Sequence, residues 1–171
     1  MTRPFADPDR IDLAAAGTHP GLQLWLVRGA AASERSTTSA ALARSLAQRH
    51  PSLVLCTDDV APRALGAAVA AAAGAPLEVC AELAADPARQ VTLATRRALR
   101  PSLVIAADGA VLAQVFTTAL GLGEADPSAV HFELGRASLL LGSKDGWLLV
   151  HHNVLDPGSL TTRAEGLGRP G

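Results

Sequence analysis

The sequence predicts a three-layer α/β fold, in which a mostly parallel β-sheet is flanked by helices on both faces. Two observations predict it. Short apolar runs alternate with longer segments of helical periodicity along most of the 171 residues. The hydrophobic fraction of 49% is also large enough for a sizeable buried core. Strands alternating with helices are typical of parallel sheets, because each crossover needs a helix to return the chain.

The first strand is expected at residues 22–27, LQLWLV, after an irregular lead-in over 1–21 that several Pro and Gly residues interrupt. A polar loop follows. The helical spacing at 37–50 places Leu42 and Leu46 on one face, and Pro51 ends this helix. The apolar run SLVLC at 52–56 then fits a second buried strand.

Asp58 and Asp59 are expected to cap a helix over 61–73, which Gly74 closes. A short extended piece is predicted at 77–79. Asp86 and Pro87 form the start signal of the next helix, with Asp at the cap and Pro in the first turn. This helix has a basic end and stops before Pro101.

A strand at 102–106 and a helix at 109–120 follow. The last third contains three extended candidates, at 130–134, 137–141 and 147–152. The SKDG turn at 143–146 predicts a hairpin between the last two. Residues 155–171 are interpreted as a flexible tail, so that the domain covers 22–154.

Composition excludes several classes of protein. The 15 Lys+Arg against 16 Asp+Glu argue against a nucleic-acid binder. No apolar run approaches the ~20 residues of a membrane span, and the charged N-terminus does not fit a signal peptide. We therefore expect a cytoplasmic protein. The amino-acid composition, rich in Ala, Arg, Gly and Pro, is typical of a GC-rich bacterial genome.

Neither a metal nor a cofactor is predicted. Cys56 and Cys80 are too few for a disulfide scaffold or a metal cluster. His151 and His152 are consecutive on a predicted strand, so they point to opposite faces and cannot chelate one ion together. The sequence also contains no Gly-x-Gly-x-x-Gly motif, no Walker-type loop and no Gly-x-Ser-x-Gly.

The candidate site lies where three predicted parallel strands end, because loops at the carboxyl ends of such strands form the site in α/β sheets. These loops begin at Arg28, Thr57 and Ala107. Three sequence blocks at these strand ends resemble those of the histidine phosphatase superfamily, the phosphoglycerate mutase-like fold. They are LWLVRGA at 24–30, LVLCT at 53–57 followed by APRAL at 61–65, and LVIAADGAVL at 103–112. The resemblance covers roughly residues 22–153.

The resemblance implies roles for individual residues, and two of them are lost. The family's nucleophilic histidine corresponds to Gly29, and the histidine of the third block corresponds to Asp108. Ala30 and Ala110 replace neighbouring motif glycines. Arg28 and Arg63 stand where the family holds phosphate oxygens. A phosphohistidine mechanism is not available, because glycine has no side chain to attack phosphorus.

Two functions follow from these residues. One is a pseudophosphatase that binds a small anionic metabolite or a protein partner at the former active site. The other is a repurposed enzyme, with Arg28 and Arg63 as an anion clamp and Asp108 as acid or base. Alternatively, Asp108 neutralises the two arginines in an ion pair. A third hypothesis is a hydrolase that retains some activity with water as the nucleophile.

Other residues are interpreted more plainly. Glu82 falls near the family's acid catalyst, although a solvated loop carboxylate is the simpler interpretation. The hydroxyl-rich run that includes Ser33, Ser36 and Ser39 fits a helix-capping loop. The terminal hairpin would leave an exposed edge strand, through which two copies of the chain could pair as a homodimer.

Overall fold

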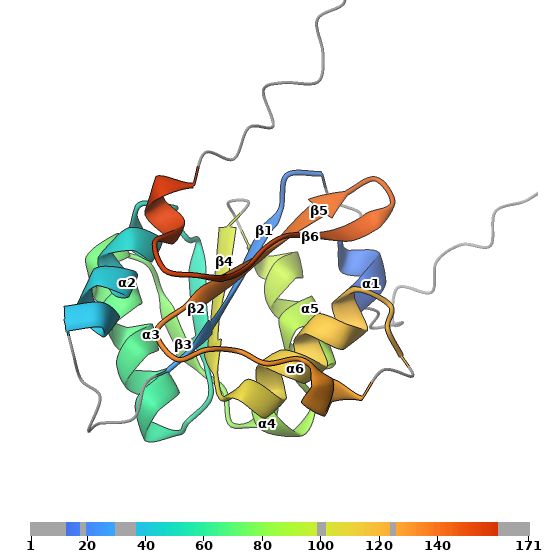
Figure 1. Ribbon diagram of the computed structural model, residues 1–171, viewed down its shortest axis with the longest axis horizontal. Coiled ribbons are helices and arrows are strands. Elements are labelled where there is room, and N and C mark those ends of the chain that lie inside the picture. Colours follow the sequence, from blue (N-terminus) through green and yellow to red (C-terminus); the bar gives the residue numbers. More distant parts are fainter. Residues whose placement is uncertain (1–12, 18–19, 30–36, 99–101, 124–125, 161–171) are drawn as a thin grey trace, which may run out of the picture.

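The structure, a computed structural model, describes residues 13–17, 20–29, 37–98, 102–123 and 126–160 (Figure 1). Helices and strands alternate as the sequence predicts. Their bounds are α1 (Leu13–Ala16), β1 (Gln23–Arg28), α2 (Thr37–Ala47), β2 (Leu53–Cys56), α3 (Val60–Ala73), β3 (Leu77–Val79), α4 (Glu82–Ala85), α5 (Pro87–Arg97), β4 (Ser102–Ala107), α6 (Gly109–Ala119), η2 (Pro127–Ala129), β5 (Ala137–Ser143), β6 (Gly146–Val154) and η3 (Pro157–Ser159).

The six strands form one sheet in the order β3-β2-β4-β1-β5-β6. The first four are parallel to one another, whereas β5 pairs antiparallel with β1 and with β6. The predicted hairpin is confirmed, because Ser143 pairs with Gly146 across its turn. The layered α/β fold is therefore confirmed, with antiparallel strands at one edge.

Helices cover both faces of this sheet (Figure 1). The alternation of side chains along β1 sends Leu24 and Leu26 to one face and Trp25 and Val27 to the other. The first pair belongs to a core with α1, α4, α5 and α6. The second pair belongs to a core with α2 and α3. All four side chains are fully buried, as the apolar run predicts.

The predicted helix signals mostly hold. The Asp86 side chain accepts a hydrogen bond from the Arg89 N–H, with Pro87 in the first turn. Gly74 ends α3 in the left-handed conformation, at φ 63°, where glycine has no steric penalty. The prediction of the α3 cap is wrong in one respect. Asp59 occupies the N-cap position, but its side chain makes no capping hydrogen bond.

The strand predicted at 130–134 is wrong. After η2 this segment is irregular, and its one bridge joins Leu134 to Arg28. The reason lies in β1, whose two edges are already occupied by β4 and β5. The segment can therefore meet β1 only at its last residue. The segment at 130–134 therefore passes along the carboxyl ends of the strands and does not add a strand to the sheet.

The lead-in contains a helical turn, α1, where the sequence predicts irregular chain. Leu13 is buried, and its carbonyl accepts a hydrogen bond from Nε1 of Trp147 at 2.7 Å. A Cβ on Gly17 would lie 2.5 Å from the Trp147 ring, so only glycine allows this approach. Contact with Trp147 therefore orders a segment that has too little apolar periodicity of its own.

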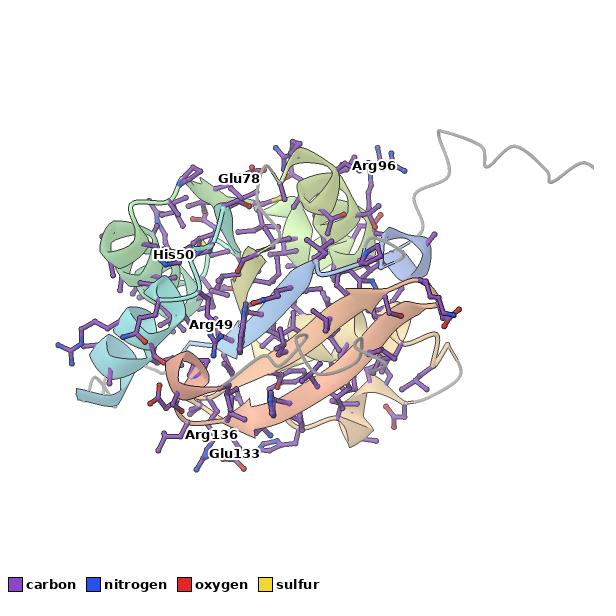
Figure 2. All side chains as sticks on the ribbon, turned by 90° about the horizontal axis from the view of Figure 1, so that it is seen from above. Arg49, His50, Glu78, Arg96, Glu133 and Arg136 are labelled. Carbon is purple, nitrogen blue, oxygen red and sulfur yellow. The ribbon has the colours of Figure 1, made fainter. Side chains whose placement is uncertain are left out.

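The part of the predicted tail around η3 lies against α2. Ser45 donates a hydrogen bond to Asp156, and this bond lowers the pKa of the Asp156 carboxyl. Arg49, labelled in Figure 2, donates from Nε to the Pro157 carbonyl at 2.7 Å and stacks over the Trp25 ring at 5.5 Å. Residues 155–160 thus cover one end of the helix layer, and residues 161–171 lie outside the described residues.

Candidate ligand pocket

The three predicted loops begin at one edge of the sheet. In the parallel register Arg28 lies opposite Ala107, and Cys56 lies opposite Ala106. The residues that follow β1, β2 and β4 therefore emerge side by side. The predicted meeting of the three strand ends is confirmed, and the site at this edge stays a prediction.

A cavity of about 460 Å³ opens at this edge, on the side of α6. That volume falls within the range of small-molecule sites. The wall facing α6 is supplied by the connection between α6 and β5. The lining residues are Arg28, Asp108, Gly109, Ala110, Ala113, Gln114, Pro127, Ser128, Val130, His131 and Phe132.

Arg28 supplies a positive charge to this cavity. Its side chain is half-buried and donates from Nη1 to the Phe132 carbonyl at 2.9 Å. A Cβ placed on Gly109 would lie 3.6 Å from the guanidinium carbon. Arg28 therefore lies along the first turn of α6 and contacts the opposite wall with one nitrogen.

Asp108 caps α6. Its Oδ1 accepts the Val111 N–H at 2.9 Å, and its backbone is extended, as expected of an N-cap residue. The side chain is exposed and lines the cavity. The predicted ion pair of Asp108 with Arg28 or Arg63 is not formed. The ion pairs among the described residues join Arg63 to Asp58, Arg97 to Glu78 and Arg136 to Glu133.

Arg63 lies apart from the cavity. Its Nη1 is 3.0 Å from Oδ1 of Asp58, and both side chains are about 60% exposed. Arg63 is not among the lining residues. The structure therefore does not bring Arg28 and Arg63 to the same cavity. The sequence predicts Asp58 as a helix cap, but its side chain instead pairs with Arg63, in the first turn of α3.

Gly29 is closed in by α3. The residue is buried, and an ideal Cβ added to it would lie 2.6–2.7 Å from the backbone of Ala61 and Pro62. Contacts of that length with backbone atoms require the helix start to move. The position is therefore restricted to glycine by packing. Of the other positions that the resemblance predicts to be altered, Ala110 lines the cavity and Ala30 lies outside the described residues.

The wall of the cavity is the part that the sequence does not predict. The His131 carbonyl accepts from Nε2 of His152 at 2.9 Å and from Nδ2 of Asn153 at 2.9 Å. Phe132 packs edge-to-face on Phe116 and on the His152 ring. A run of polar residues, His-His-Asn, at the end of an otherwise apolar strand was the available signal for this wall.

The remaining candidates lie elsewhere. Glu82 is exposed in α4, not in a loop, with its carboxylate 3.6 Å from the Cys80 sulfur. Ser39 lies in α2, whereas Ser33 and Ser36 lie outside the described residues. Neither Glu82 nor Ser39 is in the cavity lining. The described residues contain no group of three or more His, Cys, Asp and Glu that could hold a metal ion.

Both cysteines are buried free thiols. Burial raises the pKa of Cys56, partly offset by the positive charge of Arg63. Burial likewise raises the pKa of Cys80. Since the thiolate is the nucleophile, neither side chain is suited to attack a substrate at neutral pH.

Sequence comparison finds no match to any family model or curated protein. None of the helices described here combines the length and apolarity needed to cross a bilayer. Structural comparison does find similar folds. A mycobacterial glucosyl-3-phosphoglycerate phosphatase, solved in complex with VO3, has a TM-score of 0.60 at 15% identity, covering 77% of this chain and 99% of that chain.

Two further structures agree. A protein assigned as an α-ribazole-5′-P phosphatase of Escherichia coli K-12 has a TM-score of 0.63 at 13% identity, covering 80% of this chain and 99% of that chain. A protein assigned as the phosphohistidine phosphatase SixA of Agrobacterium tumefaciens has a TM-score of 0.56 at 17% identity, covering 76% and 96%. These neighbours are histidine phosphatase superfamily members, so the chain has the histidine phosphatase-like fold.

Proposed function

We propose that the chain is a pseudophosphatase, which binds a small anionic ligand in the cavity lined by Arg28 and performs no phosphoryl transfer through a phosphohistidine. One observation carries the proposal. Arg28 still lines an open cavity, while Gly29, the position that corresponds to the family's nucleophile, is packed against the start of α3. Arg28 can thus contact an anion in the cavity, while position 29 has no room for a nucleophilic side chain.

The absence of a nucleophile at Gly29 is built into the packing. Covalent phosphoryl transfer needs a side chain with a lone pair in line with phosphorus. A histidine at Gly29 would place its Cβ within 2.7 Å of the α3 backbone before any ring atom is added. Restoring the nucleophile therefore requires more than one substitution. The neighbouring position Asp108 adds a negative charge, which disfavours a phosphate-like transition state.

An anion in this cavity would have two sources of attraction. Arg28 provides guanidinium donors, of which only Nη1 is used by the Phe132 carbonyl. The first turn of α6 provides backbone N–H groups at Gly109 and Ala110, at the positive end of an eleven-residue helix. The Asp108 carboxylate lines the same cavity and opposes an anion, but its Oδ1 accepts the Val111 N–H, which engages part of its charge. The net attraction therefore comes from Arg28 and the N–H groups of α6. Arg63 is left out of the proposal, since its guanidinium pairs with Asp58.

The cavity favours a small ligand over a protein partner. A volume of about 460 Å³ has room for a metabolite-sized molecule, whereas a protein would need a broad complementary surface. The polar lining residues Gln114, Ser128 and His131 can orient such a ligand.

The experiment is a thermal-shift titration with inorganic phosphate and sulfate, with sodium chloride at equal ionic strength as reference. A ligand that binds only the folded state raises Tm by mass action. We expect the shift in the wild type and in Arg44→Ala, which removes an exposed arginine of α2. We expect no shift in Arg28→Ala. Because Arg28 also holds Phe132, only the ligand-induced change in Tm is compared.

Activity is measured on the same proteins. We expect no turnover of generic phosphomonoesters. Release of phosphate together with a phosphorylated side chain trapped on the chain would contradict the proposal. An equal anion-induced shift in wild type and Arg28→Ala would also contradict it, because Arg28 would then not be the binding group.

A second candidate is a repurposed enzyme in which Asp108 moves protons. The observation in its favour is that the exposed Asp108 and Arg28 line the same cavity. Asp108→Asn separates the two functions, because asparagine still caps a helix but cannot act as acid or base. Turnover of a phosphate- or carboxylate-bearing substrate that Asp108→Asn abolishes would support the enzyme. Unchanged anion binding with no turnover supports the binding protein.

A further inference from the structure

The two edges of the sheet differ in how they are protected. Strand β3 has three residues, and its Glu78 is ion-paired with Arg97. Strand β6 has nine residues and contains no Asp, Glu, Lys or Arg. Figure 2 shows Glu78 on the opposite side of the molecule from Glu133 and Arg136, which lie near the end of β6. Short length and charged residues usually prevent an edge strand from pairing with another chain, and of these two edges only β3 has both.

The exposed apolar residues of β6 face both sides of the sheet. Leu148 and Leu149 are 53% and 44% exposed. They pair with the consecutive β5 residues Leu141 and Leu140, so they project to opposite faces. Val150, the next residue, is also exposed. A helix or a flat surface would cover only one face. A strand added in the plane of the sheet would cover both.

We infer that β6 is an interface at which a second copy of this chain adds its own β6, antiparallel and related by a two-fold axis. An antiparallel strand pair is self-complementary in this way, since each residue meets its symmetry mate. An axis at Leu149 places Leu149 opposite itself and Leu148 opposite Val150. The apolar residues are then matched, and no like charges meet along 147–151.

Charges at the two ends fit the same arrangement. With the axis at Leu149, Asp145 of one copy lies opposite Asn153 of the other. The carbonyl of Asn153 accepts a hydrogen bond from Arg136, and its side chain accepts from the Glu133 N–H. The turn that carries Lys144 and Asp145 thus approaches the Glu133–Arg136 pair of the other copy. Each of these two clusters carries one positive and one negative charge, so no net repulsion opposes a second copy there.

The interface is short. A register irregularity in the β5–β6 ladder near Leu139 leaves Val150 unpaired with β5 and bends β6 at that point. Near the end of β6, Arg136 occupies the Asn153 carbonyl. A ladder centred on 147–151 buries less area than a permanent dimer, so we expect association in the micromolar range.

The test is sedimentation analysis over a range of protein concentrations. We expect a wild-type dimer that dissociates on dilution. Leu149→Lys puts two like charges opposite each other across the axis and should weaken dimerisation about tenfold or more. Leu77→Lys is the matched control, because Leu77 is similarly exposed (38%) on the other edge, and should leave dimerisation unchanged. Thermal melts confirm that both variants fold.

A cross-link tests the register. Opposed residues of an antiparallel pair lie at distances that a disulfide can span. Leu149→Cys should form an intermolecular disulfide under mild oxidation, and Leu77→Cys should not. The native Cys56 and Cys80 are buried and do not compete. A wild-type monomer at several hundred micromolar, an effect of Leu77→Lys equal to that of Leu149→Lys, or absence of the Leu149→Cys cross-link would overturn the inference.

Discussion

Two glycines at the carboxyl-end edge of the sheet stand in opposite environments. Gly29 follows β1 and is enclosed by α3, where a Cβ would lie 2.6–2.7 Å from backbone atoms. Gly109 begins α6, where a Cβ would lie 3.6–3.8 Å from the Arg28 side chain, an ordinary contact distance. The edge is therefore closed on the α3 side and open on the α6 side. The difference shows that the positions where the two helices begin shape this edge of the sheet.

The N-terminal caps of α3 and α6 also differ between the closed and the open side. α6 is capped by the Asp108 side chain, whereas the Asp59 side chain at α3 makes no capping bond. On the α3 side, Asp58 pairs with Arg63 at the surface. On the α6 side, the cap residue and Arg28 line the cavity. The α3 side contributes packing to the site, and the α6 side contributes polar groups.

The largest effect is expected at Gly29. Gly29→Ala should lower the free energy of unfolding by about 2 kcal/mol or more, because the α3 start must shift to admit a methyl group. Gly109→Ala, the control on the open side, should be neutral or stabilising, since alanine is favoured in helices. Chemical denaturation measures both. Equal effects of the two substitutions would show that α3 does not close the Gly29 position.

The cap residues give a smaller difference. Asp108→Ala should lower the free energy of unfolding by about 1 kcal/mol, because the Val111 N–H loses its acceptor. Asp108→Ser should restore most of that stability, as serine also caps helices. Asp59→Ala should have a smaller effect than Asp108→Ala, because no capping bond is lost. If Asp108→Ser is as unstable as Asp108→Ala, the carboxylate stabilises the fold by its charge and not by capping.

The fold and one edge of the site could be predicted from sequence because both depend on local patterns. The apolar runs ending at Val27, Cys56 and Ala106 predict parallel strands, and parallel strands bring their ends together. The pocket wall could not be predicted in this way. It depends on Phe132 and His131, which are held by contacts with residues about 20 positions along the chain or more. The closure of Gly29 likewise depends on a contact with Ala61 that no local pattern encodes.

The smallest effect is expected at Arg63. The Arg63–Asp58 pair is about 60% exposed, so solvent and salt screen it, and Arg63→Ala should lower the free energy of unfolding by less than about 0.5 kcal/mol. Denaturation at low and high salt measures this effect, which should shrink as salt rises. The same variant should keep the anion-induced rise in Tm that Arg28→Ala loses, because Arg63 does not line the cavity. Loss of that rise in Arg63→Ala would mean that the bound state draws Arg63 away from Asp58 and joins the two sides of the edge into one anion clamp.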